Sequence, residues 1–239
     1  ARAIRIIQKN LVKKVLDTLT ELKEKNPERY QEFWTAFGTM LKEGLHTDFE
    51  NGERLQELLM YESSQLEPGK RTTLAEYVSR MPEAQKEIYF LTAENRTAAA
   101  NAPQLEAFKA KGYEVLFFTD PVDDWLSQDL TSYKEKKLRN IAKGDVDIES
   151  DEEKAAKETS RKQAEADNKD LVTAIKDILG DKVKEVRLSK RLTESACCLV
   201  SDEWGMGIHM EKIMKAINPD TPPTKRILEL NPDHPLIGA

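Results

Sequence analysis

The chain has 239 residues, of which 39% are hydrophobic and 33% are charged, with a formal net charge of −6. This composition is typical of a well-solvated globular protein, and the negative charge argues against nucleic acid as the main partner. The longest apolar runs, such as residues 115–118, are far shorter than the roughly 20 residues that cross a bilayer. No signal peptide is expected, because residues 1–25 alternate charged and apolar side chains.

A long amphipathic helix is predicted over residues 3–24. Its apolar side chains recur every three or four residues, with lysine and arginine between them: Ile4, Ile7, Leu11, Val15, Leu19 and Leu22. Ala1 falls inside this pattern without a capping residue before it, so we expect the helix to continue upstream of the chain. A second helix is predicted from Pro27 to about Gly44, because proline suits the first helical position. A third, shorter helix is expected over residues 52–59.

Alternating strands and helices are predicted in the middle of the chain. Residues 87–92 and 113–119 are rich in aromatic and β-branched side chains, as buried strands are. A helix between them, from Pro103 to Gly112, implies that the two strands pair in parallel. Further helices are expected at two places, residues 73–81 and residues 120–130.

A domain boundary is predicted at residues 145–153, where six of nine residues are acidic. A polar, helix-prone stretch follows, and then an apolar helix that is expected to end at Gly180. Residues 183–188 and 196–200 are predicted to form a strand pair. The last strand is predicted over residues 225–230. No helical pattern follows it, so we expect the second domain to be truncated.

No catalytic site is predicted. The sequence contains no Gly-x-Gly-x-x-Gly, no Walker phosphate loop, no His-Glu-x-x-His and no nucleophile elbow. Asp120, Asp123 and Asp124 could suggest a metal site. We favour a structural interpretation, in which Asp120 caps a helix that begins at Pro121.

The two cysteines, Cys197 and Cys198, are adjacent, and neighbouring cysteines rarely reach the geometry of a disulfide. We predict buried thiols in a reducing compartment, which makes the cytoplasm the expected location. Three scattered histidines and the absence of Cys-x-x-Cys argue against a metal site.

A methionine-rich helix near residues 204–217 has the most distinctive pattern in the sequence. Its apolar side chains form one stripe at helical spacing: Met206, Met210, Ile213, Met214 and Ile217. Methionine adapts its shape and is frequent on surfaces that bind many partners, yet spacing alone favours an ordinary core face. Gly205 and Gly207 weaken the first turn, so we expect this helix to shift or fray.

Trp125 raises the same question of core or surface. It follows two aspartates, and its neighbours Ser127, Gln128 and Asp129 are polar. This setting favours an amphipathic surface helix, on which an exposed aromatic side chain often marks a contact site.

Several long strings resemble the 90-kDa heat-shock chaperone family, in its bacterial form more than its eukaryotic one. They occur in the family's order and span essentially the whole chain. The most specific are LKEGLHTDFEN (41–51), TTLAEYVSRMPEAQKEIYFLTAEN (72–95), KGYEVLFFTDPVDDW (111–125), VKEVRLSKRLTESAC (183–197) and TKRILELNPDHPLI (224–237).

The resemblance implies a mixed α/β fold that covers the later middle domain and the start of the C-terminal domain. Residues 1–50 would be a helical connector, residues 51–145 a small αβα sandwich with a short parallel sheet, and residues 146–239 a truncated α+β domain. Family members are ATP-driven homodimers that use ATP and Mg. Their nucleotide pocket and catalytic arginine would precede this chain, and their dimerisation helices would follow it. We therefore expect no enzyme activity, no cofactor and weak or no dimerisation for these residues alone.

The resemblance also implies a molecular chaperone that binds and remodels partly folded client proteins, possible co-chaperones, and neither nucleic acid nor membrane as partner. The residues that would contact clients lie in two groups: Asp124, Trp125 and Gln128 in the middle domain, and Met206, Met210, Ile213 and Met214 in the C-terminal domain. Gln128 stands where the family usually has asparagine. The alternative is a structural connector whose apolar helix is buried in the dimer and does not touch clients.

Overall fold

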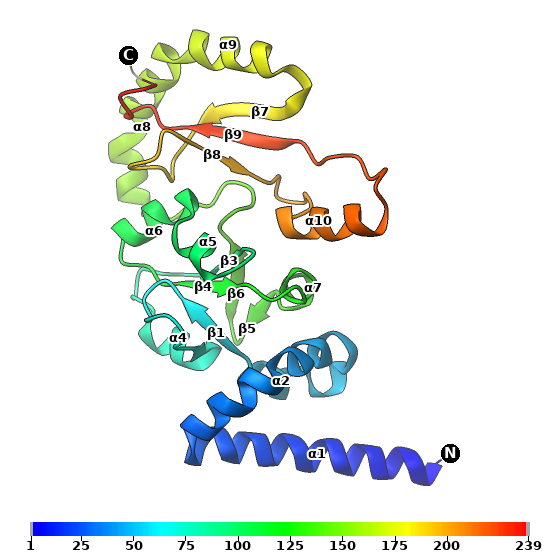
Figure 1. Ribbon diagram of the computed structural model, residues 1–239. Coiled ribbons are helices and arrows are strands. Elements are labelled where there is room, and N and C mark those ends of the chain that lie inside the picture. Colours follow the sequence, from blue (N-terminus) through cyan, green and yellow to red (C-terminus); the bar gives the residue numbers. More distant parts are fainter. Residues whose placement is uncertain (1, 238–239) are drawn as a thin grey trace.

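The computed structural model describes residues 2–237 and has the mixed α/β fold that the sequence predicts. Figure 1 shows the N-terminal helices at one end, a six-stranded sheet in the middle and a three-stranded sheet at the other end. Within the described residues, no helix has the length and apolar character that a membrane crossing requires.

Helices α1 (Arg2–Lys25) and α2 (Pro27–Thr47) form the N-terminal end of the molecule. Asn26 separates them because its side chain accepts a hydrogen bond from the Arg29 N–H and caps α2, which begins with proline. Only the second half of α1 packs against α2, through Leu16 and Leu19. The predicted apolar stripe is therefore half exposed, and its first half projects from the body of the molecule.

The six-stranded sheet has the order β2-β1-β4-β3-β6-β5. Its strands β3 and β4 pair in parallel, as the sequence predicts, and β6 pairs in parallel on the other side of β3. The other pairings in the sheet are antiparallel. The strands are β1 (Met60–Ser63), β2 (Thr72–Thr73), β3 (Ile88–Thr92), β4 (Val115–Phe118), β5 (Ser132–Tyr133) and β6 (Lys136–Asn140).

Helices cover both faces of this sheet, because successive side chains of a strand point to opposite faces. Ile88 and Phe90 of β3 pack into one core, whereas Tyr89 and Leu91 pack into the other. The first core is closed by α1, α2, α3 (Gly52–Leu58), α4 (Leu74–Arg80) and α7 (Asp123–Asp129). The second is closed by α5 (Arg96–Ala100) and α6 (Glu106–Ala110), with a short 3-10 turn (Pro103–Leu105) before α6.

The three-stranded sheet has the order β7-β9-β8, with β7 parallel and β8 antiparallel to β9. The predicted pairing of residues 183–188 with 196–200 is therefore wrong. The distant strand β9 lies between them, and its apolar residues pack on both neighbours. The strands are β7 (Val183–Leu188), β8 (Cys197–Val200) and β9 (Arg226–Leu230).

Helices α8 (Asp151–Asp167) and α9 (Lys169–Leu179) connect the two sheets, and α9 packs against β7. A reciprocal cap starts α8: the Ser150 hydroxyl accepts from the Glu153 N–H, and the Glu153 carboxylate accepts from the Ser150 N–H. Helix α10 (Ile208–Ile217) follows β8 and faces α7 across the gap between the sheets.

Candidate functional site

A cleft of about 750 Å³ lies between the two sheets. One wall is α7 and β6, and the other is the segment 203–207 with α10. Six of the seven residues predicted from the sequence line it: Asp124, Trp125, Gln128, Met206, Met210 and Met214. Ile213, the seventh, does not line the cleft. Two groups that are about 80 residues apart in sequence are thus brought together.

The first wall is anchored by a buried lysine of α2. The Lys42 ammonium lies 2.7 Å from Asp120 Oδ2 and 2.8 Å from Asp123 Oδ1. Burial raises the pKa of Asp123, and the positive charge of Lys42 acts against that rise. The predicted cap is therefore wrong: α7 begins at Asp123 without a side-chain cap. The Asp120 carboxylate binds the buried ammonium, which needs counter-charges in the low-dielectric interior.

Trp125 and Asp124 are adjacent on α7 but differ in environment. The Trp125 side chain is 44% exposed, as the polar neighbours on its helix predict. Asp124 is buried at the start of α10, where a Cβ added to Gly207 would lie 3.3 Å from Asp124 Oδ1. Gly207 is the N-cap residue of α10 and offers no side-chain cap. The Asp124 carboxylate therefore places negative charge at this helix N-terminus and links the two walls.

The methionines of the second wall differ in solvent exposure. Met210 is only 8% exposed, whereas Met206, Ile213 and Met214 are half-buried and Ile217 is exposed. Met206 precedes α10 instead of lying on it. The stripe therefore combines the two interpretations of the sequence: Met210 is buried, whereas Met206 and Met214 keep part of their surface in the cleft.

A buried arginine holds the start of this wall in place. Arg226 Nη1 donates to the Met206 carbonyl at 2.5 Å and to the Ser201 hydroxyl at 2.5 Å. Its Nη2 lies 2.5 Å from Glu211 Oε2 on the first turn of α10. The guanidinium thus ties the segment before α10 to strand β9.

Trp204 and Lys143 are among the cleft residues that the sequence analysis did not propose as site residues. Trp204 is 92% exposed at the rim, between Glu203 and Gly205. The sequence feature that could have indicated Trp204 is an aromatic residue within a turn. Lys143 follows β6 in a polar loop, and no sequence pattern distinguishes it. Arg139 and Glu203 form an ion pair across the cleft at 2.8 Å.

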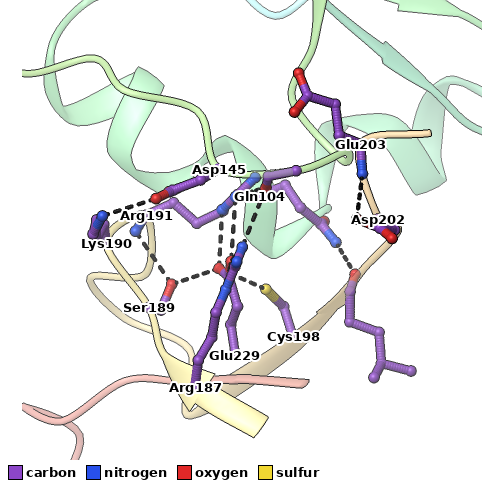
Figure 2. A network of polar contacts seen from close by, with 12 residues as sticks. Gln104, Asp145, Arg187, Ser189, Lys190, Arg191, Cys198, Asp202, Glu203 and Glu229 are labelled. Carbon is purple, nitrogen blue, oxygen red and sulfur yellow. Dashed lines mark hydrogen bonds and ion pairs between the residues drawn. The ribbon is translucent and has the colours of Figure 1, made fainter. Parts of the chain in front are cut away.

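A polar network around Glu229 connects the two sheets (Figure 2). The buried Glu229 of β9 lies 2.6 Å from Arg187 Nη2 and 2.9 Å from Arg191 Nε. Burial opposes ionisation of Arg187, but its bonds to Glu229 outweigh that effect and raise its pKa. Arg191 also donates to the main-chain carbonyls of Ile141 and Gly144, which follow β6.

A second carboxylate joins the sheets from α6. Glu106 accepts backbone N–H bonds from Thr193, Glu194 and Ser195 at 2.7, 2.8 and 3.1 Å, and it also binds the Ser195 hydroxyl. Partial burial acts to raise the pKa of Glu106, but these donors together lower it. The Arg191 guanidinium, which pairs with Glu229 of β9, and the Glu106 carboxylate of α6 thus both connect the two sheets.

The two cysteines differ from each other. Cys198 is buried, and burial raises the pKa of its thiol to about 12. Cys197 is exposed, so the prediction of two buried thiols is wrong for this residue. Alternation along β8 explains the difference, because adjacent side chains of a strand face opposite sides. Among the described residues, no group of three or more acidic, histidine or cysteine side chains could hold a metal ion.

Comparison with known proteins decides the family. The family described as "Hsp90 protein" matches residues 1–239. The chain belongs to the Hsp90 family. It is 53% identical to "Chaperone protein HtpG" of Geobacter metallireducens and 51% identical to that of Geobacter sulfurreducens, over 98% of this chain in both. It is 47% identical to the protein of the same name from Mycolicibacterium gilvum, over 99% of the chain. This Hsp90 chain spans 36% of the length of each of these relatives.

Proposed function

We propose that the cleft between α7 and α10 binds partly folded client proteins on behalf of a full-length HtpG-type chaperone. The observation that carries this proposal is the meeting of an exposed tryptophan and half-buried methionines in one cleft, in a chain of the Hsp90 family. Exposed apolar groups at the junction of two units are a typical setting for binding sites.

The chemistry of the walls suits clients of varied sequence. Trp125 offers a large, rigid surface, and Met206 and Met214 can change rotamer to fit different apolar side chains. Each such contact contributes about 1–2 kcal/mol, below the range of interface hot spots. Several weak contacts allow binding without preventing release, and the ion pair between Arg139 and Glu203 keeps the rim hydrated.

For the full-length protein we propose ATP- and Mg-dependent cycling, a homodimer, contacts with co-chaperones and a cytoplasmic location. In this assignment residues 1–50 are the helical connector and residues 51–145 the small αβα part of the middle domain, and residues 146–239 begin the C-terminal domain. ATP hydrolysis would belong to other parts of the full-length protein. The role of these residues would be client contact and coupling between domains.

The alternative function is a connector in which α10 is buried in the dimer and never touches a client. The exposed Ile217 and the half-buried Ile213 favour some additional covering of this helix. The two functions differ in what Trp125 does, because it lies on the opposite wall and gains nothing from burial of α10 alone.

The deciding experiment measures binding of a permanently unfolded model protein to the full-length chaperone carrying Trp125→Arg or Met214→Lys. We expect each substitution to weaken binding about fivefold or more, since each loses an apolar contact worth 1 kcal/mol or more. Matched controls are Phe37→Arg, with a side chain 47% exposed on α2, and Met40→Lys on the same helix. Unchanged binding by folded, dimeric cleft variants would favour the connector.

A further inference from the structure

Lys143 lies at the point where the two sheets meet. Ser201, which follows β8, donates its N–H to the Ala142 carbonyl at 2.9 Å and accepts the Gly144 N–H at 2.9 Å. The main chain is thus held on both sides of Lys143, and the half-buried Lys143 side chain lines the cleft. Its position is fixed by the junction of the two walls and not by a flexible loop.

The charged groups around Lys143 are largely engaged elsewhere. Arg139 pairs with Glu203, and Arg226 pairs with Glu211. Asp124, whose negative charge acts on the ammonium, lies at the start of α10. Among the side chains that the structure describes, none forms a hydrogen bond or an ion pair with the Lys143 ammonium.

The environment of this ammonium is unfavourable for an isolated charge. Burial lowers the pKa of Lys143, and the positive charge of Arg226 acts in the same direction, whereas Asp124 opposes them. An ammonium has three donors, and partial burial in the cleft leaves those of Lys143 less hydrated than they would be on the open surface. A ligand that brings an acceptor to this position replaces the lost hydration on binding.

We propose that Lys143 selects client segments that carry a carboxylate beside their apolar residues. This inference rests on the proposed function of the cleft and adds a preference in chemistry to it. The apolar residues of the segment contact Trp125 and Met214, while the aspartate or glutamate side chain accepts hydrogen bonds from the Lys143 ammonium. A charge-assisted bond in a partly desolvated cleft is stronger than the same pair on the open surface.

The test uses a fluorescent extended peptide with a core of leucine and phenylalanine and one variable position beside it. The position holds aspartate, its neutral isostere asparagine, or lysine, and dissociation constants are measured at fixed salt. We expect the aspartate peptide to bind the unmodified protein about tenfold more tightly than the asparagine peptide. The lysine peptide should bind most weakly, because like charges repel.

Three variants assign the preference to Lys143. Lys143→Met should remove the difference between aspartate and asparagine while leaving the asparagine peptide within about twofold. Lys143→Arg keeps the charge and should keep the preference. Lys162→Met on α8 removes one positive charge from a remote exposed site and should also keep it. Circular dichroism verifies the fold of each variant.

Two outcomes would overturn the inference while leaving client binding intact. One is equal affinity of the unmodified protein for the aspartate and asparagine peptides. The other is a preference that survives in Lys143→Met, which would assign it to the general field of the cleft or to the N-terminus of α10. Absence of binding for all three peptides would overturn the proposed function together with this inference.

Discussion

Substitution of Glu106 by glutamine tests whether one carboxylate holds the two sheets together. The Glu106 carboxylate accepts three backbone N–H bonds and one hydroxyl bond from residues 193–195. Glutamine keeps the size of the side chain but has no negative charge. Its amide NH₂ is a donor and cannot accept hydrogen bonds from the N–H groups of residues 193–195. Bonds to a charged group contribute about 1.5–3 kcal/mol each when buried. Because this loop is partly exposed, we expect Glu106→Gln to lower the unfolding free energy by about 2 kcal/mol in total.

The contribution of Glu106 to the unfolding free energy depends on pH. The folded-state pKa of Glu106 lies below its ordinary value, so its contribution is complete above the unfolded pKa near 4.5. The contribution disappears as pH falls through the folded-state pKa. Urea unfolding should therefore show a clear difference between Glu106→Gln and the unmodified chain at pH 7 and a much smaller one in acid.

Two further measurements distinguish the specific hydrogen bonds of Glu106 from a general effect of its negative charge. Glu194→Gln removes the same charge from an exposed neighbouring residue and should leave stability nearly unchanged. Amide hydrogen exchange at Thr193, Glu194 and Ser195 should accelerate in Glu106→Gln, because an NH₂ group replaces one acceptor oxygen and the remaining amide oxygen carries no full charge. A stability difference that stays the same from pH 7 down to pH 3 would refute the reasoning.

Three other predictions concern the interior. Lys42→Met leaves the buried Asp123 carboxylate and the partly exposed Asp120 carboxylate without their counter-charge and should destabilise the chain by about 3 kcal/mol in urea unfolding. Gly38→Ala places a Cβ 2.6 Å from the Trp34 ring, so Trp34 must move, and thermal unfolding should show a loss of about 1–3 kcal/mol. A thiol reagent at pH 8 should react quickly with Cys197 and only upon unfolding with Cys198, whose thiol is buried with a pKa of about 12. Two rapidly reacting thiols in the folded chain would contradict this last expectation.

Local patterns in the sequence predicted the elements that follow local rules. Helices α1 and α2 were predictable because their apolar residues recur at helical spacing and proline marks a start. Strands β3 and β4 were predictable because both are continuous apolar runs, as strands covered on both faces are. In contrast, β6 has the sequence KKLRN, with half-exposed side chains and no alternation that distinguishes it from a loop.

Features that depend on distant contacts were beyond these patterns. Asp120 has the local sequence of a helix cap, but its carboxylate binds Lys42 instead. Lys42 lies 78 residues away in sequence, so no local pattern could indicate this ion pair. The position of β9 between β7 and β8 depends on a strand that follows both along the chain. In the cleft, the residue types on each wall were predictable, but the depth of Met210 and the presence of Lys143 depend on how the two sheets meet.

Most of the hydrogen bonds between the two sheets have a main-chain N–H or carbonyl group as one partner. Arg191 donates to the carbonyls of Ile141 and Gly144, and Glu106 accepts the N–H groups of residues 193–195. Main-chain groups are the same whatever side chain they carry. The loops at this junction can therefore change their side chains, including those that face the cleft, without changing the angle between its walls. A protein built in this way can acquire new ligand preferences through single substitutions while its framework stays constant.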